Sequence, residues 1–110
     1  MKEDIILAKR YLTKAKNAID KGKEFSLSLK HFTRMMNRKH CQYTGLRFSD
    51  DVNSPLYRTL ERVDASIGYT DTNTIVVCHS INLLKSVIDD SNNPVTTAHV
   101  AKMLKKLAAI

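Results

Sequence analysis

The chain has 110 residues, the length of one domain, and 43% of them are hydrophobic, which supports a packed core and excludes wholesale disorder. No apolar run approaches the ~18 residues of a membrane-spanning helix, and the acidic start with Glu3 and Asp4 is unlike a secretory signal. Two cysteines are too few for a disulfide framework, so we expect a reduced, cytoplasmic protein with no membrane partner.

The net charge of +7 is unevenly distributed along the chain. Residues 1–40 carry 11 Lys and Arg against 4 Asp and Glu, residues 41–95 carry 4 against 7, and residues 96–110 carry 3 Lys and no acid. A positive balance favours an anionic partner, nucleic acid first. An acidic middle between basic arms suits a metal site flanked by phosphate-binding surfaces. The alternative is two solvated basic helices around an ordinary middle.

The first half of the chain reads as two helices followed by irregular structure. Apolar residues recur at helical spacing over 3–20, where no Gly or Pro interrupts them. In chain order we expect a helix over 3–20 ended by Gly22, a helix from an N-cap at Ser26 or Ser28 to about Arg38, a tight turn over 41–45, and a polar loop over 49–55.

The second half predicts strand, loop, strand and two helices. A strand is expected over Thr59–Val63, a loop over 68–73, a β-branched strand over Thr74–Cys78, a helix over Ser80–Asp89, and a last helix from the N-cap Thr96 to Leu107. The sequence therefore predicts a single α+β domain over 1–110. Its parts are a basic helical arm over 1–40, a strand–loop–strand–helix core over 41–90, and a C-terminal helix over 95–110.

Short motifs follow one another in a fixed order through this core. They are Cys41-Gln42-Tyr43-Thr44-Gly45, Glu61-Arg62-Val63-Asp64, Gly68-Tyr69-Thr70-Asp71-Thr72-Asn73 and Cys78-His79-Ser80-Ile81-Asn82-Leu83-Leu84-Lys85. The combination, over roughly residues 41–88, resembles the HNH or His-Me finger endonucleases in a phage-associated form. The resemblance implies a ββα-metal core that hydrolyses DNA phosphodiester bonds, encoded by a phage and acting in the cytoplasm of its bacterial host.

The resemblance also implies roles for individual residues. Glu61 falls at the acid position and Asn82 at the helix position of a site for one divalent metal. Carboxylate and amide oxygens suit Mg²⁺ or Mn²⁺. Asn73 falls where the family ties its loop together through side-chain hydrogen bonds, and Gly68 begins that loop, so both are expected to be structural.

Arg62 departs from the family, which places a general-base His directly after the acid. Arg stays protonated and cannot be that base, although it can bind the scissile phosphate or stabilise its developing charge. Asp64 and His79 are the nearest other candidates for the base; in a regular strand Asp64 would face away from Glu61. Two hypotheses stay open: an active endonuclease with another base, or an inactive HNH-fold protein that binds nucleic acid or a host protein as a regulator or inhibitor. A basic DNA-binding module with a chance match is a third.

Some HNH proteins hold zinc with two Cys-x-x-Cys pairs. Cys41 and Cys78 correspond to the first cysteine of each pair. Here the second positions are Thr44 and Ile81, and two thiolates do not complete a four-ligand site. We therefore expect no structural zinc and two core cysteines. DNA is the expected partner, contacted through phosphate by the basic residues in and before the motifs, which are Arg38, Lys39, Arg58, Arg62 and Lys85.

Overall fold

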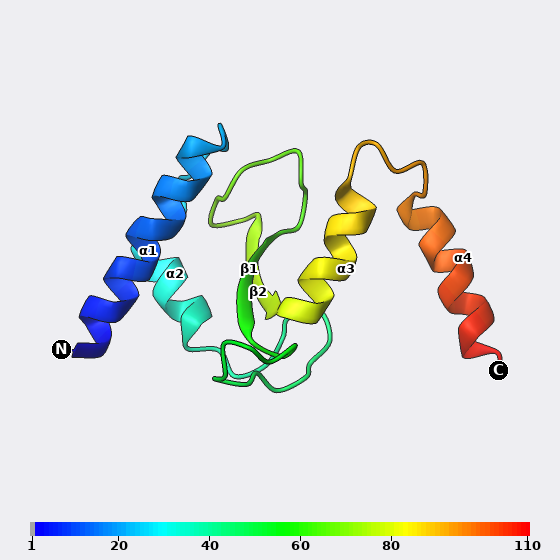
Figure 1. Cartoon of the computed structure of the whole chain (residues 1–110), viewed down its shortest axis with the longest axis horizontal. Helices are drawn as coiled ribbons and strands as arrows, with labels where there is room; N and C mark the ends of the chain where they lie inside the picture. The colour runs from blue at the N-terminus through cyan, green and yellow to red at the C-terminus, as the bar shows by residue number, and fades with distance from the viewer. Residues whose placement is uncertain (1) are drawn as a thin grey trace.

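The computed structural model describes residues 2–110 and contains, within them, four helices and one two-stranded sheet, so the predicted α+β class is confirmed. The elements are α1 Lys2–Asp20, α2 Leu29–Met36, β1 Arg58–Arg62, β2 Thr74–Cys78, α3 His79–Asp89 and α4 Thr97–Ala108. In Figure 1, α1 and α2 lie on one side of the sheet, α3 lies on the other, and α4 is outermost beyond α3. No helix in the described part is long and apolar enough to cross a membrane.

The helix ends follow local chemistry. Gly22 takes a φ of 72° and the Lys23 N–H donates to the Ala18 carbonyl at 2.9 Å, which ends α1 where Gly22 predicts. Ser28, and not Ser26, caps α2 by accepting a hydrogen bond from the His31 N–H at 3.1 Å. This helix ends at Met36, two residues before the predicted Arg38.

The antiparallel strands pair with Leu60 opposite Val76. The first strand runs one residue earlier than predicted, from Arg58 to Arg62, while the second has the predicted bounds. Val76 is fully buried and Leu60 is 7% exposed, and both belong to a core that α2 completes with Phe32 and Met35. This core lies between the sheet and the N-terminal helices. The face of β1 that carries Leu60 therefore points toward those helices, and the side chains next to Leu60 in the strand point the other way.

The turn before the sheet closes one of its edges. The Gln42 N–H donates to the Val76 carbonyl at 3.0 Å, and the Gln42 side-chain oxygen accepts from the Val76 N–H at 2.8 Å. Next to it, the Cys78 N–H lies 3.4 Å from the Cys41 sulfur, and both thiols are free and buried. The two cysteines are thus core residues, as predicted.

Candidate functional site

The predicted site residues that belong to β1 lie on its two opposite faces. Side chains alternate along a strand, so Thr59 and Glu61 point toward α3 while Arg58, Leu60 and Arg62 point toward the N-terminal helices. The sequence placed Glu61 and Arg62 in one site because they are neighbours in the chain. In the structure, neighbouring side chains on a strand point to opposite faces, so those of Glu61 and Arg62 are apart.

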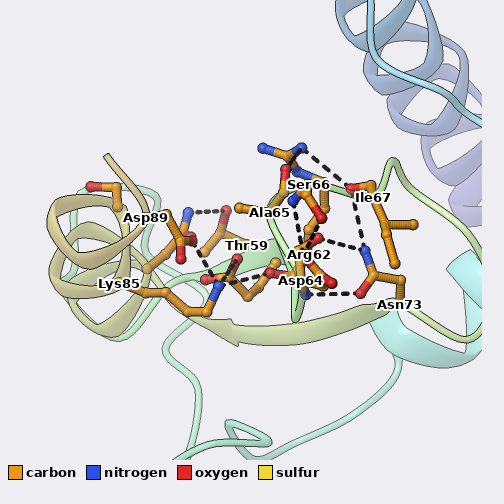
Figure 2. Close-up of polar contacts among 12 residues, drawn as sticks. Thr59, Arg62, Asp64, Ala65, Ser66, Ile67, Asn73, Lys85 and Asp89 are labelled. Carbon is orange, nitrogen blue, oxygen red and sulfur yellow. Dashed lines mark hydrogen bonds and ion pairs between the residues drawn. The ribbon is translucent and has the colours of Figure 1, made fainter. Parts of the chain in front are cut away.

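Glu61 lies in a buried polar cluster beneath α3. The Lys85 ammonium is 3.4 Å from Glu61 Oε1, 2.9 Å from the Arg62 carbonyl and 2.7 Å from Asp89 Oδ2 (Figure 2). Glu61 is only 6% exposed, and its Oε2 has no hydrogen-bond partner among the described residues. Lys85 is therefore shared between two carboxylates and is 19% exposed, so the DNA contact predicted for it would compete with these ion pairs.

Burial sets the protonation of this cluster. Desolvation raises the pKa of the Glu61 carboxyl above its ordinary value, and the nearby Lys85 charge only partly opposes it. Desolvation alone would lower the pKa of Lys85, but the hydrogen bond to Asp89 and the charges of both carboxylates outweigh it and raise this pKa. A cation thus stands permanently beside Glu61 at neutral pH.

The donors predicted to hold Mg²⁺ or Mn²⁺ do not fit such an ion as they are arranged. On α3, Lys85 is the residue that contacts Glu61, whereas the Asn82 amide lies 3.4 Å from the Thr59 hydroxyl, one helical turn earlier. An ammonium at 3.4 Å from the carboxylate repels a divalent cation. The described residues contain no group of three or more His, Cys, Asp or Glu that could hold a metal. Of the two predicted metal ligands, Glu61 keeps one buried oxygen, Oε2, without a hydrogen-bond partner among the described residues.

Neither candidate base makes a hydrogen bond to Glu61 within the described part of the chain. Asp64 lies in the bend after β1, and its Oδ1 accepts from the Ser66 N–H at 2.9 Å and the Ser66 hydroxyl at 2.6 Å. The Ser66 hydrogen bonds hold the pKa of Asp64 below its usual value. His79 is exposed at the start of α3, with its N–H donating to the Tyr57 carbonyl at 2.8 Å.

Asn73 ties the loop between the strands together, as the resemblance implies. Its Oδ1 accepts from the Asp64 N–H at 2.9 Å (Figure 2). Its Nδ2 donates to the carbonyls of Asp64 and Gly68 at 3.0 Å and of Ile67 at 3.3 Å. The same loop rests on the segment after α1, because a Cβ at Gly68 would lie 2.4 Å from the Glu24 carbonyl oxygen. Both residues are structural.

Arg62 extends along this loop, away from Glu61. Its Nη1 donates to the Ala65 carbonyl at 2.7 Å and lies 3.4 Å from the Ile67 carbonyl. Its guanidinium is 5.4 Å from the ring centroid of Tyr69, and the Lys14 ammonium from α1 is 4.9 Å from the same centroid. A buried tyrosine therefore holds two cations at the surface between β1 and α1.

A groove of about 430 Å³ continues this surface between α1 and β1, and we call it the basic groove. The groove is lined by the cations Arg10, Lys14 and Arg58, by one acid, Asp50, and by Leu7, Phe32, Met36, Tyr57, Thr59 and Leu60. Arg58 also bonds Asp50 at 2.7 Å and the Arg38 carbonyl at 3.0 Å, which brings exposed Arg38 and Lys39 to this end of the molecule.

The sequence indicated Arg58 but neither Arg10, Lys14 nor Tyr69 as a site residue. The available signal was the i, i+4 spacing of Arg10 and Lys14 on one face of an amphipathic helix. A second signal was the aromatic residue inside the Gly-Tyr-Thr motif.

Comparison with known proteins adds little to this geometry. No family model and no solved structure matches the chain. A curated relative, described as the uncharacterized protein R423 of Acanthamoeba polyphaga mimivirus, is 24% identical over 84 residues. The match covers 76% of this chain and 15% of the viral protein, so the chain corresponds to a small part of that relative.

Proposed function

We propose that this chain binds nucleic acid through the sugar–phosphate backbone, at the basic groove and at the adjoining Tyr69. The observation that carries the proposal is the pair of cations on Tyr69: Lys14 and Arg62 both contact its ring, and neither has a carboxylate partner within the described residues. Their charge is thus available to an anion.

The positions of these cations favour a phosphate chain over a small anion. Arg10 and Lys14 lie one turn apart on α1, and Arg58 and Arg62 lie on one face of β1, so four cations line a surface between two elements. Arg58 is paired with Asp50, so the proposal rests on Arg10, Lys14 and Arg62. Two loop carbonyls and Tyr69 hold Arg62 in place, which lowers the entropy lost when it binds. Phosphate contacts carry no base information, so we expect binding without sequence preference.

A binding role on an HNH-like framework is favoured over cleavage by the arrangement of the other face of β1. Lys85 stands beside Glu61, Arg62 points away from it, and neither Asp64 nor His79 hydrogen bonds to it. The similarity to a mimivirus protein supports an origin in a viral genome.

Fluorescence anisotropy with a labelled DNA duplex of about 20 base pairs tests the binding proposal. We expect the logarithm of the affinity to fall linearly with the logarithm of salt concentration, and Arg10→Gln and Lys14→Gln to reduce that slope by about 1 each. The matched control is Lys16→Gln, an exposed lysine of the same helix paired with Asp20. An absence of salt-dependent binding, or an equal loss in the control, would overturn the proposal.

Metal-dependent hydrolysis of DNA is the second candidate, and the buried, unpartnered Glu61 Oε2 favours it. It requires Lys85 to leave the carboxylate. Incubation with supercoiled plasmid and Mg²⁺ or Mn²⁺ tests it, with Glu61→Gln and Asn82→Ala expected to abolish nicking. Arg62→His restores the family residue, yet its side chain would point away from Glu61. We therefore expect no gain of activity from that variant, and a gain would contradict the placement of Arg62.

A further inference from the structure

The C-terminal helix α4 is an amphipathic helix without a packing partner for its apolar side. Its apolar row is formed by Val100, Met103, Leu104 and Leu107, which recur at helical spacing. Met103, Leu104 and Leu107 are 50%, 56% and 54% exposed, and none of the 12 described residues of α4 is buried. In Figure 1 the helix stands clear of the rest of the molecule.

A helix of this length is not self-sufficient in water. Isolated helices shorter than about 12–15 residues are marginal, because the nucleation cost is not recovered without packing of an apolar face. The N-terminus of α4 is nevertheless well formed: Thr96 and His99 make a capping box in which each side chain accepts from the backbone of the other. The capping residues thus favour a helix here, although its apolar row is not covered by the rest of the chain.

The exposed surface area of the whole chain is also larger than that of a compact monomer. A compact monomer of 12.5 kDa exposes about 6,200 Å², whereas this chain exposes 7900 Å². The excess of about 1,700 Å² is larger than the roughly 800 Å² that each partner contributes to a standard interface. The radius of gyration of 15.3 Å likewise exceeds the ~13 Å expected for this length. The chain therefore exposes enough surface for a stable interface.

An apolar groove of about 370 Å³ lies beside the start of α4. Its apolar lining is Tyr43, Val63, Ile81, Leu84 and Ile88, and its polar lining is Thr44, Lys85, Asp89 and Thr97. Thr97, the first residue of α4, lines this groove, and the rest of the helix does not contribute to the lining. Val100, Met103, Leu104 and Leu107 are thus not part of the groove lining of their own chain.

The charges of the two surfaces are complementary. The helix carries Lys102, Lys105 and Lys106 and no acid, while the groove is lined by Asp89, which pairs with Lys85 of the same lining, and is followed by the exposed Asp90. By helical spacing Lys106 borders the apolar row next to Met103, whereas Lys102 and Lys105 lie on the opposite face of α4. The row can therefore enter an apolar groove while the Lys106 ammonium reaches an acid at its edge.

We propose that a second copy of this chain occupies the groove, with α4 of each copy lying in the groove of the other. Such an exchange is self-complementary under a two-fold axis, so both contacts form at once. Phosphate does not cover an apolar row, which argues against nucleic acid as the occupant of this face. The inference does not rest on the proposed nucleic-acid binding, since the basic groove lies on the other side of the sheet.

Sedimentation equilibrium of the full chain between about 1 and 100 µM tests the proposal. We expect a species of twice 12.5 kDa at the upper concentrations. Leu104→Glu with Leu107→Glu should raise the dimer dissociation constant at least about 100-fold, because two apolar contacts become buried charges. The matched control is Leu12→Glu, which places the same charge at a 65% exposed position on α1 and should leave the dimer intact. Circular dichroism of each variant confirms that it folds.

Hydrogen exchange by mass spectrometry supplies the second measurement. Amides of 97–108 should be protected in the dimer and lose that protection in the double variant. A chain that is monomeric throughout the concentration range overturns the proposal, as does a dimer whose α4 amides stay unprotected. Protection that appears only on adding duplex DNA or anionic vesicles would also overturn it and assign the helix to that partner.

Discussion

Replacement of Lys85 by Met tests the buried cluster most directly. The substitution removes the ammonium that contacts Glu61, Asp89 and the Arg62 carbonyl while keeping a side chain of similar length. Glu61 is then left with no compensating cation at a site where its side chain is 7% exposed. We expect a large, pH-dependent loss of stability, measured as the free energy of unfolding in urea by circular dichroism.

The magnitude has a lower and an upper bound. Removal of one member of a buried ion pair costs about 3–5 kcal/mol when the other stays charged. Glu61 can avoid that cost by binding a proton. Protonation requires about 1.4 kcal/mol for each pH unit above the ordinary pKa of a glutamate, which is about 4 kcal/mol at pH 7.5 and about 1 kcal/mol at pH 5. We therefore expect a loss of about 3 kcal/mol at pH 7.5 and about 1 kcal/mol at pH 5. In urea the first corresponds to a midpoint lower by about 1.5–2 M.

The direction of the pH effect follows from the pKa of Glu61. Because burial raises this pKa in the folded state, the folded chain binds the proton more tightly than the unfolded chain does. Stability therefore falls as the pH rises from the ordinary value of a glutamate through the raised folded value. Loss of Lys85 widens that range, and the further change Glu61→Gln should remove the pH dependence and restore most of the stability.

Lys16→Met is the matched control. Lys16 also forms an i, i+4 pair, with Asp20 at 2.9 Å, but the two side chains are 76% and 59% exposed. Its loss should cost about 0.5 kcal/mol or less at either pH. A loss below about 1 kcal/mol for Lys85→Met at pH 7.5, or one of equal size at both pH values, would refute the reasoning.

Three further predictions concern the loop and the helix caps, and thermal unfolding measures each. Gly68→Ala should lower the free energy of unfolding by about 2–3 kcal/mol, because the new Cβ would meet the Glu24 carbonyl. Gly22→Ala, in open space at a φ of 72°, should lower it by only about 1 kcal/mol. Equal losses in the two variants would contradict the contact at Gly68. Asn73→Asp keeps one acceptor but loses the donor to three carbonyls, so we expect at least about 3 kcal/mol. Ser28→Ala removes the cap of α2 and should cost about 1 kcal/mol.

Elements specified by neighbouring residues could be predicted from the sequence. The β-branched run over Thr74–Cys78 forms a strand with the predicted bounds, and Thr96 caps α4, because strand propensity and capping depend on residues close in the chain. The loop tie by Asn73 was predicted from the family resemblance, and its partners lie within nine residues of it.

The site could be predicted only in part, because its contacts join residues far apart in the sequence. Asn82 and Lys85 lie one turn apart on the same side of α3, so spacing alone does not decide which of them meets Glu61. The direction of Arg62 depends on the face of β1 that packs on the core and on loop carbonyls at Ala65 and Ile67. These are tertiary effects that no short motif contains.

Gln42 has a consequence for the behaviour of the chain at high concentration. The middle of β2, Ile75-Val76-Val77, is the kind of segment that recruits further strands when its edge is open, and a two-stranded sheet has no interior strand to hide it. Gln42 occupies that edge at Val76 with both its backbone and its side chain, and His31 and Cys41 contact the backbone of Thr74 and Cys78 along the same edge. The edge of the most apolar strand is therefore covered, which is how native sheets avoid the addition of further strands.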